Sequence, residues 1–399
     1  MIEQKHLGYC EKPYFCTMGN AVFSSKQTLA ILGGGQLGKM MLVKCRQWDV
    51  FTKVLDPSPT APARLLADDF IVGDLMDYQT VVDFGQQADV VTIEIENVNI
   101  EALYTLEKQG KKVCPKPATL EIIQSKARQK QFYNDQQFPS SPHKMFAQKP
   151  EWKDIETPCI WKASRFGYDG FGVKKIETQT DWKSIPDVPC ILEDCVSISN
   201  EIAVIVARNE KGKCVSYRPV EMEFHPKANQ VEFVFTPSTL NEKQLTDAQK
   251  LAEQVAHELE HVGILAVELF LNEEGALLIN EVAPRPHNSG HLTIEAAMTS
   301  QFEQHLRTIL GLPFGDCQFF HDAIMVNLVG AKGFQGTVVY EGMDDLLEIS
   351  GLHVHLYGKA ETRPMRKMGH ITLVGSDIDI LRQTAKQVKQ QVTVRSDKS

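Results

Sequence analysis

The chain has 399 residues, 43% of them hydrophobic, a length that exceeds one ordinary core and predicts two or three globular domains. Its formal net charge of −9 argues against general binding of nucleic acid or anionic membranes, so we expect a small-molecule partner. Nine cysteines form no C-x-x-C pair, which argues against a zinc site and indicates buried thiols in a reducing, cytoplasmic setting.

The first 27 residues carry charges and aromatic side chains but lack the continuous apolar segment of a secretory signal. We expect a disordered extension over residues 1–27, or an upstream start ahead of Met18. No apolar run in the sequence is long enough to cross a membrane, so no membrane partner is expected.

From residue 28 to about residue 114, apolar strand patterns alternate with helical ones. A helix is expected after the first strand, because Leu37, Met41 and Cys45 recur at helical spacing. Strands are expected at 28–32 and near 50–55, 69–72 and 90–94. This alternation predicts a parallel, doubly wound, Rossmann-like domain over residues 28–135.

The remaining residues divide into two further domains. Lys116-Pro117 predicts a turn into a basic helix, and the proline-rich segment 138–142 predicts a linker. We expect a small β-rich central domain over 136–200 and a C-terminal domain over 201–399. The C-terminal domain is expected to contain a helix near 245–261, a hairpin at 264–282 and a final β-rich segment with a charged terminal helix.

The stretch ILGGGQLGKM, residues 31–40, matches G-x-G-x-x-G and follows an apolar strand. Asp56 closes the next apolar run, where a dinucleotide-binding domain has an acid for the ribose. This fingerprint raises the hypothesis of an NAD-dependent oxidoreductase.

A second glycine-rich loop spans residues 164–172, between one strand that ends near Lys162 and another strand. It is not a Walker loop, because no G-K-[ST] enters a helix. Glycines between strands are typical of a flap that closes over phosphates, with Lys162 as the charge partner. An ordinary hairpin turn at Asp169-Gly170 is the simpler alternative.

The segment 265–283 predicts a hairpin of two apolar strands around Asn272–Gly275. That loop would place Glu268 opposite Ile279, with Glu281 one diagonal step away on the same face. Two carboxylates that point together predict a Mg²⁺ ion held against phosphates. A solvent-exposed pair of acids is the alternative.

Two loops rich in donors follow. The loop 284–291 combines arginine, amide and hydroxyl groups with prolines, which suits a small planar anion, although such a loop is often merely a turn. Arg363, Arg366 and Lys367 concentrate positive charge in one turn of an acidic protein, which favours a phosphate site over a solvated basic loop.

Six sets of motifs occur in a characteristic order between about residues 28 and 381. They are GGGQLGKMM (33–41), EIEN (94–97), GYDGFG (167–172), VELF with NEVAPRPHNSGH (267–270, 280–291), MVNLVG (325–330), and HLYGK with RPMRKMGHI (355–371). This set resembles the 5-(carboxyamino)imidazole ribonucleotide synthetases, ATP-grasp ligases of purine biosynthesis. The resemblance implies an ATP-grasp fold, ATP and two Mg²⁺ ions as cofactors, and a homodimer.

The resemblance also implies roles for individual residues in nucleotide and metal binding. Glu268 and Glu281 would hold the magnesium ions. ATP contacts would come from Lys126, Lys162, Gly167, Tyr168, Asp169, Gly170, Phe171, Gly172, Glu193, Asp194, Cys195, Val196, Glu201, His225, Asn280 and Glu281. The flap departs from the family pattern, because Phe166 and Phe171 replace a glycine and a basic residue. Lys126 stands where the family has arginine, and the nearby Arg128 is an alternative.

The remaining roles concern the reacting groups. Bicarbonate would lie near Arg285, His287, Asn288 and His291. The imidazole ribonucleotide would contact Gln36, Glu96, Tyr168 and Asp169, with its phosphate at Lys359, Arg366 and Lys367. Asp169 is the expected handler of the amine proton. In this family the N-terminal glycine loop approaches the ribonucleotide rather than a dinucleotide, which answers the oxidoreductase hypothesis.

The implied reaction carboxylates 5-aminoimidazole ribonucleotide with bicarbonate and ATP, by way of carboxyphosphate. Another ATP-grasp ligase, such as formate-dependent glycinamide ribonucleotide transformylase, is the nearest alternative. An oxidoreductase and a non-catalytic nucleotide-binding module are more distant ones.

Overall fold

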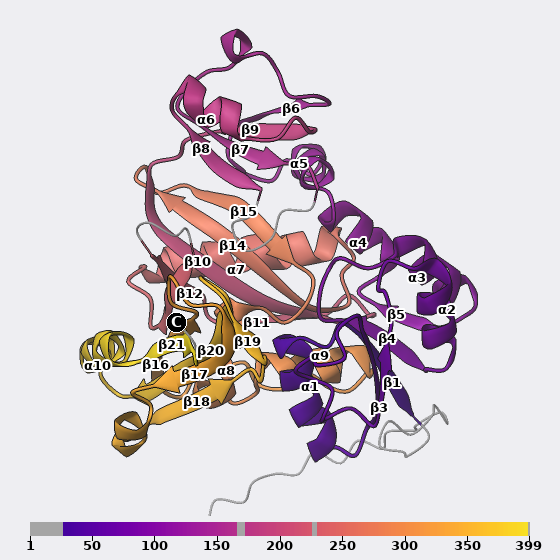
Figure 1. The fold of residues 1–399 in the computed structure, drawn as a ribbon. Coiled ribbons are helices and arrows are strands. Elements are labelled where there is room, and N and C mark those ends of the chain that lie inside the picture. Colours follow the sequence, from indigo (N-terminus) through magenta and orange to yellow (C-terminus); the bar gives the residue numbers. More distant parts are fainter. Residues whose placement is uncertain (1–26, 166–171, 226–229, 398–399) are drawn as a thin grey trace, which may run out of the picture.

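The computed structural model describes residues 27–165, 172–225 and 230–397 (Figure 1). The N-terminal part is a parallel five-stranded sheet of order β3-β2-β1-β4-β5. Its strands are β1 (Thr28–Leu32), β2 (Phe51–Asp56), β3 (Asp69–Val72), β4 (Val90–Ile93) and β5 (Lys112–Cys114). The predicted strands and their parallel arrangement are confirmed.

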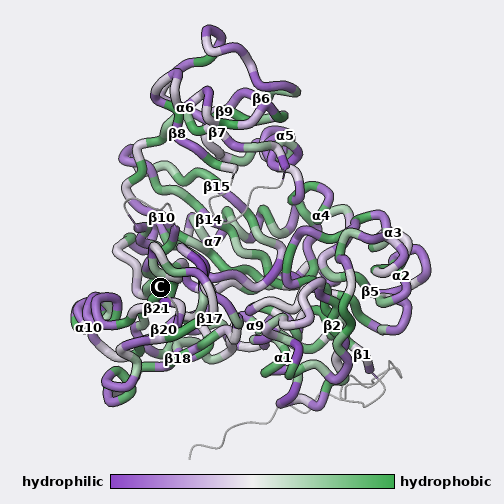
Figure 2. Tube along the Cα trace, viewed as in Figure 1, coloured by the Kyte–Doolittle hydropathy of each residue, from purple (hydrophilic) through white to green (hydrophobic). Residues whose placement is uncertain are grey.

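Helices cover both faces of this sheet: α1 (Gln36–Gln47), α2 (Tyr78–Gln86) and α3 (Ile100–Lys108). Alternate residues of β1 therefore enter two different cores. Leu29 and Ile31 pack with α1, whereas Ala30 and Leu32 pack with α2 and α3. Burial on both faces explains why these strands are continuously apolar. Figure 2 shows β1 and β2 as strongly hydrophobic and α10 as largely hydrophilic.

The predicted basic helix after Lys116-Pro117 is two helices, α4 (Pro117–Ile123) and α5 (Lys126–Asp135). The prediction of a single helix is wrong because Ser125 adopts an extended conformation and its side chain accepts from the backbone N–H of Arg128 at 3.3 Å. This N-cap begins a new helix.

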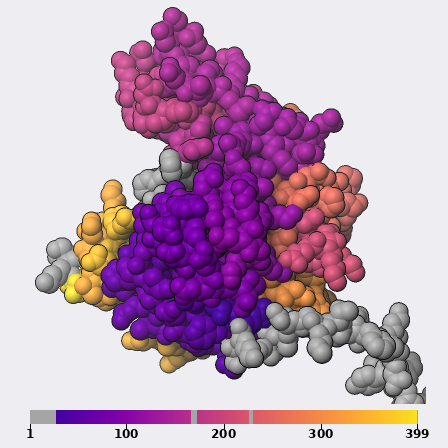
Figure 3. Space-filling view, turned by 90° about the vertical axis from the view of Figure 1, so that its right-hand side faces the viewer, coloured from indigo at the N-terminus to yellow at the C-terminus, as the bar shows by residue number. Residues whose placement is uncertain are grey.

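The central part is an antiparallel sheet of order β6-β9-β7-β8. Figure 3 shows that the central part projects above the N-terminal part. Its elements are β6 (His143–Phe146), η1 (Trp152–Asp154), β7 (Cys159–Ala163), β8 (Val173–Ile176), α6 (Gln179–Ser184) and β9 (Cys190–Asp194). Lys162 pairs with Val173 across the second glycine loop, so the predicted strand–loop–strand arrangement is confirmed. Residues 166–171 of that loop lie outside the described residues.

The C-terminal part contains a larger sheet of order β15-β14-β10-β12-β13-β16-β20-β18, with β11 paired to β10. Its strands are β10 (Ile198–Arg208), β11 (Cys214–Ser216), β12 (Val220–Phe224), β13 (Val231–Thr236), β14 (Gly263–Asn272), β15 (Leu277–Ala283), β16 (Asp322–Val329), β18 (Leu352–Leu356) and β20 (Lys367–Gly375). A small sheet joins β17 (Gly336–Glu341), β19 (Glu361–Thr362) and β21 (Thr393–Ser396).

Helices of the C-terminal part cover this sheet and reach the N-terminal core. They are α7 (Glu242–Glu258), η2 (Asn288–Gly290), α8 (Thr293–Ala296), α9 (Gln301–Ile309), η3 (Asp344–Glu348) and α10 (Ile378–Gln391). α7 starts earlier than predicted because Asn241 and Gln244 form a capping box. Phe302 and Leu306 of α9 pack in the same core as α1, which fixes the C-terminal part against the glycine loop.

Two further expectations concern cysteines and membranes. The described cysteines are all free, and Cys45, Cys114, Cys159 and Cys190 are buried as expected. Cys195, which follows the last residue of β9, is exposed. In the part of the chain that the structure describes, no helix combines the length and the apolar character needed to cross a membrane.

Candidate active site

The paired acids lie on the hairpin of β14 and β15. Glu268 stands directly opposite Glu281, and Leu269 stands opposite Ile279, so a bulge leaves Asn280 between the two pairs. The predicted register, with Glu268 opposite Ile279, is therefore wrong. The turn lies one residue later than predicted, and the bulge adds a further residue on β15. Both shifts bring the carboxylates closer together than the sequence indicated.

Glu268 lies among other acids, Glu281 and Glu201, with too little positive charge nearby to balance them. Burial, then the charges of Glu281 and Glu201, raise the pKa of Glu268 to about 8. Burial also raises the pKa of Glu201 on β10 to about 7. The side chain of Glu268 is 18% exposed and that of Glu281 is 48% exposed, so the solvent-exposed alternative does not fit Glu268. A divalent cation would stabilise such a group of hard oxygen ligands.

Three lysines face the acids from α5 and β7. Lys126 Nζ lies 3.2 Å from Glu281 Oε1, and Lys162 Nζ donates to Asn280 Oδ1 at 3.3 Å. Lys162 and Lys130 also flank Glu193, at 2.9 and 3.1 Å. Burial alone would raise the pKa of Glu193, but these two lysines together hold it below its usual value. Such lysines can receive the phosphates of a nucleotide.

Lys130 was not among the predicted site residues, although it follows Lys126 by one helical turn. That i, i+4 spacing on a basic helix is the signal that could have identified it. Of the two alternatives for the missing arginine, Lys126 contacts the paired acids, whereas Arg128 pairs with Glu121 and is half exposed.

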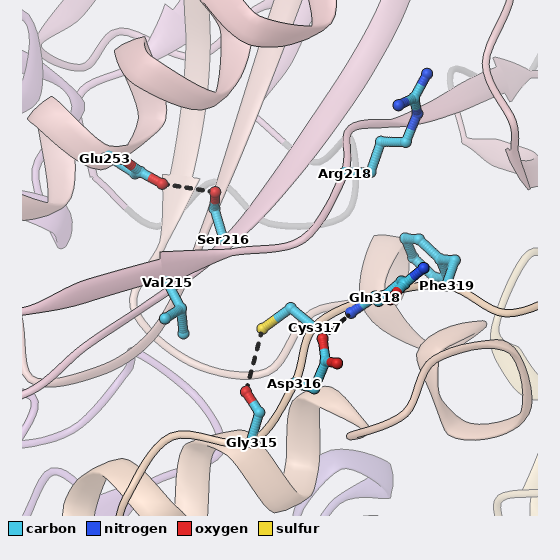
Figure 4. A pocket seen from close by; sticks show the side chains of 9 residues that line it. All are labelled: Val215, Ser216, Arg218, Glu253, Gly315, Asp316, Cys317, Gln318 and Phe319. Carbon is cyan, nitrogen blue, oxygen red and sulfur yellow. Dashed lines mark hydrogen bonds between the residues drawn. The ribbon is translucent and has the colours of Figure 1, made fainter. Parts of the chain in front are cut away.

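The larger of two cavities in the described chain lies away from the lysines and the paired acids. The larger cavity, about 590 Å³, lies between β11, α7 and the segment 315–319 (Figure 4). It contains none of the predicted site residues. The cavity among the lysines measures only about 10 Å³, too small for more than a single water, so these side chains must move to admit a ligand. Its lining residues are Lys126, Gln129, Lys130, Tyr133, Lys162, Glu193 and Asn280.

The first glycine loop is already occupied by a carboxylate of the protein itself. Glu94, just after β4, accepts from the backbone N–H groups of Gly35, Leu37 and Gly38 at 2.9, 3.2 and 3.2 Å. A Cβ atom on Gly35 would lie 2.4 Å from Glu94 Oε1, so this glycine makes room for the carboxylate. Asp56 accepts from Gly34 N–H at 2.7 Å. The N–H groups of Gly34, Gly35, Leu37 and Gly38 are therefore already bound within the protein, which argues against a dinucleotide pyrophosphate here and against the oxidoreductase hypothesis.

The donor-rich loop connects the acids to the N-terminal part. Arg285 Nε lies 2.9 Å from Glu96 Oε1. His287 Nδ1 lies 3.0 Å from Ser289 Oγ and 3.7 Å from Glu268 Oε1. The loop thus brings together the predicted residues Glu96, Arg285 and His287 at the end of β15.

Buried amides hold the rest of this loop. Asn288 and Asn327 exchange two hydrogen bonds of 2.9 Å. Gln301 accepts from His287 N–H at 2.9 Å, donates to the carbonyl oxygen of His287 at 2.8 Å and lies 3.1 Å from His291 Nδ1. Burial lowers the pKa values of His287 and His291 well below the usual value, so both rings are neutral. The loop is therefore held in place by side-chain hydrogen bonds and is not a plain turn.

The basic cluster lies beside helix α1. Lys359 donates to the carbonyl oxygen of Lys367 at 2.7 Å, and Arg366 donates to that of Glu361 at 2.6 Å. Lys39 of α1 donates to the carbonyl oxygen of Leu356 at 2.8 Å. Lys39 was not predicted. It follows Gln36, the first residue of α1, by three residues, so the helix presents both toward the basic loop.

Other predicted residues are not joined to this arrangement by the contacts described. Gly167, Tyr168, Asp169, Gly170 and Phe171 lie outside the described residues. Gly172 follows them with φ of 79°, a conformation that favours glycine. Asp194, Cys195 and Val196 follow Glu193 from the end of β9 toward β10, and His225 directly follows β12. Their contacts with a nucleotide stay predictions.

Lysines above a pair of hairpin carboxylates, with a Rossmann-like sheet beside them, define an ATP-grasp protein. The ATP-grasp domain family matches residues 131–302, and the ribonucleotide synthetase preATP-grasp domain matches 26–124. The phosphoribosylaminoimidazole carboxylase C-terminal domain matches 323–384. The chain belongs to the N5-carboxyaminoimidazole ribonucleotide synthase family, and the predicted fold class and family are confirmed.

Individual relatives cover most of the chain. The N5-carboxyaminoimidazole ribonucleotide synthase of Bacillus subtilis is 35% identical over 90% of this chain and 94% of that protein. The chloroplastic phosphoribosylaminoimidazole carboxylase of Vigna aconitifolia is 37% identical over 88% of this chain, which spans only 64% of that longer protein.

Solved structures agree with this assignment. The N5-carboxyaminoimidazole ribonucleotide synthetase of Thermotoga maritima has a TM-score of 0.86 and 40% identity, covering 93% of this chain and 100% of that one. The Aspergillus clavatus N5-carboxyaminoimidazole synthase, in complex with ADP and 5-aminoimidazole ribonucleotide, has a TM-score of 0.83 and 27% identity. It covers 92% of this chain and 98% of that one.

Proposed function

We propose that the protein uses ATP and bicarbonate to carboxylate 5-aminoimidazole ribonucleotide, forming N5-carboxyaminoimidazole ribonucleotide, ADP and phosphate in purine biosynthesis. The observation that carries this proposal is the connection between two sites. Glu268 faces Glu281 below the lysines, and His287 and the Arg285–Glu96 ion pair continue from this acid pair to the N-terminal part. A phosphate-cleaving site thus adjoins an acceptor site.

ATP would lie between the central and C-terminal sheets. Lys126, Lys162 and the flap 167–172 would contact the phosphates, residues 193–196 the adenine, Glu201 the ribose and His225 a further part of the nucleotide. Lys130 would assist by sharing the charge of Glu193, which leaves Lys162 available to the phosphates.

Glu268 and Glu281, with Asn280 beside them, are suited to two Mg²⁺ ions. The fit rests on hard oxygen donors and on the shortage of positive charge that raises the pKa of Glu268 to about 8. The described residues include no cluster of three His, Cys, Asp or Glu side chains that could bind a metal by themselves, so phosphate oxygens and water would complete the coordination. When bound, magnesium would offset the charge of the triphosphate.

The chain's own residues position the reactants. Bicarbonate beside Arg285, His287, Asn288 and His291 attacks the γ-phosphorus, the bond to the ADP oxygen breaks, and carboxyphosphate forms. The exocyclic amine of the ribonucleotide then attacks the carboxyl carbon, phosphate leaves, and Asp169 receives the amine proton. The neutral His287 and His291 rings can orient the anion without adding charge.

The acceptor would lie between the N-terminal part and the C-terminal sheet, near the contact of Lys39 on α1 with Leu356 on β18. Gln36, Glu96, Tyr168 and Asp169 would contact its ring and ribose, and Lys359, Arg366 and Lys367 its phosphate. We also infer a cytoplasmic homodimer with domains at 28–135, 136–200 and 201–399, preceded by the extension 1–27.

The test is ADP release by the purified protein with Mg-ATP and bicarbonate, with and without 5-aminoimidazole ribonucleotide. Strong stimulation by the ribonucleotide, with a product that loses CO₂ in acid, is expected. Stimulation by formate and glycinamide ribonucleotide instead would assign the chain to the alternative ligase reaction and refute the proposal.

A further inference from the structure

A row of polar side chains crosses three neighbouring strands of the C-terminal sheet. Asn327 on β16 pairs with His370 on β20, and His370 pairs with His355 on β18. Residues directly opposite each other share a face of the sheet, so the three side chains lie side by side. Asn327 and His370 are buried, in a sheet whose neighbouring residues are mostly apolar.

Each member of this row meets one residue of the donor-rich loop or of helix α8, which follows it. Asn327 exchanges hydrogen bonds with Asn288, as described above. The ring of His370 stacks on His291, with centroids 4.7 Å apart and planes inclined by 30°. His355 Nε2 lies 2.6 Å from Glu295 Oε1. The sheet therefore holds the segment 288–295 by three different contacts.

Tyr357 fixes the central ring of the row. Its hydroxyl lies 3.1 Å from His370 Nδ1, and this is the single hydrogen bond of the His370 ring within the described part of the chain. His370 Nε2 is buried there without a hydrogen-bond partner. The ring is otherwise held by stacking between His291 and His355, at 4.7 and 4.5 Å. Its orientation thus depends on Tyr357.

The other side of Tyr357 meets the basic cluster. Lys359 Nζ lies 5.5 Å from the centroid of the Tyr357 ring, within the range of a cation–π contact. The same Nζ donates to the carbonyl oxygen of Lys367, the first residue of β20. Tyr357 therefore contacts both a lysine of the proposed phosphate site and a ring that stacks on the proposed bicarbonate loop.

We propose that Tyr357 and His370 are positioning residues that couple the ribonucleotide phosphate site at Lys359 to the bicarbonate loop at His291. This inference rests on the proposed function. A ribonucleotide phosphate that holds Lys359 in place also holds the Tyr357 ring, and through it His370 and His291. Bicarbonate is then best aligned for attack on ATP when the acceptor is present, which limits loss of carboxyphosphate to water.

The test compares two tyrosine variants. Tyr357→Phe removes the hydroxyl bonded to His370 and keeps the ring below Lys359. Tyr340→Phe is a matched control, because its hydroxyl donates to the carbonyl oxygen of Met368 at 3.0 Å, two residues from His370 on the same strand. We expect Tyr357→Phe to lower kcat/KM for the ribonucleotide about fivefold, the usual effect of one hydrogen bond. The KM for ATP should not change.

Melting temperatures check that each variant is folded, and a double-mutant cycle separates coupling from a merely structural role. If Tyr340→Phe lowers kcat/KM for the ribonucleotide as much as Tyr357→Phe does, the coupling is refuted. In a Lys359→Ala background, Tyr357→Phe should have little further effect, whereas full additivity would also refute it. If the wild-type protein shows no stimulation by the ribonucleotide, the proposed function fails and the coupling fails with it. Wild-type stimulation beside unchanged Tyr357→Phe kinetics refutes the coupling alone.

Discussion

Two largely buried carboxylates, Glu94 just after β4 and Glu268 within β14, have opposite surroundings. Glu94 is held by three backbone amides of the first glycine loop, so the fold itself completes that site. Glu268 faces another acid across the hairpin, and Nδ1 of the neutral His287 lies 3.7 Å from its Oε1. The comparison teaches that a glycine fingerprint indicates an anion beside a helix, and that the anion can belong to the protein.

The largest expected effect comes from removing one of the paired acids, Glu268 and Glu281. Glu281→Ala removes half of the facing pair, and we expect ATP turnover to fall on the order of 10³-fold, the scale for loss of a group that offsets transition-state charge. ADP release measures it. Glu274→Gln, in the exposed turn of the same hairpin, is the control and should retain wild-type activity. Near-normal turnover of Glu281→Ala would refute the metal assignment.

A third buried acid, Glu193, lies between these extremes because two lysines neutralise it. Lys130→Met removes one of them, so Lys162 must balance Glu193 alone and is less available to phosphates. We expect the KM for ATP to rise about tenfold, the scale of a charge-assisted contact. Lys144→Met, which removes an exposed ion pair of the same sheet, is the control. An unchanged KM for ATP would show that Glu193 does not need Lys130.

A change at Glu94 should lower the stability of the protein rather than the rate of catalysis. Glu94→Gln places an amide group against backbone N–H donors, and we expect a loss of about 1–3 kcal/mol and a lower melting temperature. Glu101→Gln on the exposed face of α3 is the control. If both variants melt together with the wild type, the glycine loop does not depend on the Glu94 carboxylate.

Much of this arrangement follows from local sequence patterns, and the rest depends on contacts between distant segments. The N-terminal strands were predicted correctly because burial on both faces makes them continuously apolar. The pairing of Glu268 with Glu281 was predicted one step off, since a shift of the turn and a bulge leave no mark in the hydrophobic pattern. The ATP-grasp assignment came from motifs, not from periodicity.

The functional residues that the sequence did not predict also depend on contacts between distant segments. Glu94 is only two residues from the predicted Glu96, yet its role requires knowing that β4 ends beside the first turn of α1. Lys39 and Lys130 both lie on predicted helical segments, but their partners come from other sheets. The i, i+4 spacing could have indicated Lys130, but the contact partners of both lysines arise from packing between domains and leave no sequence pattern.

The smallest expected effect is a pH dependence of stability in the absence of magnesium. The folded pKa of Glu268 is about 8 and its ordinary value is 4.5, so between these values the folded state keeps a proton that the unfolded state has lost. Stability therefore falls as pH rises through this window. The buried histidines His287, His291 and His370 act in the opposite direction, because their pKa values are lowered, but their contribution is complete above their ordinary value of 6.5.

The interval from pH 7 to 8.5 consequently isolates the acids. We expect the melting temperature of the metal-free protein to fall across it, and Glu268→Gln to flatten the profile because the amide has no proton to lose. Added Mg²⁺ should raise the melting temperature most at the upper end, where the ionised Glu268 binds it best. A slope that survives Glu268→Gln would mean that another group, such as Glu201 with its pKa of about 7, accounts for the pH dependence instead of Glu268.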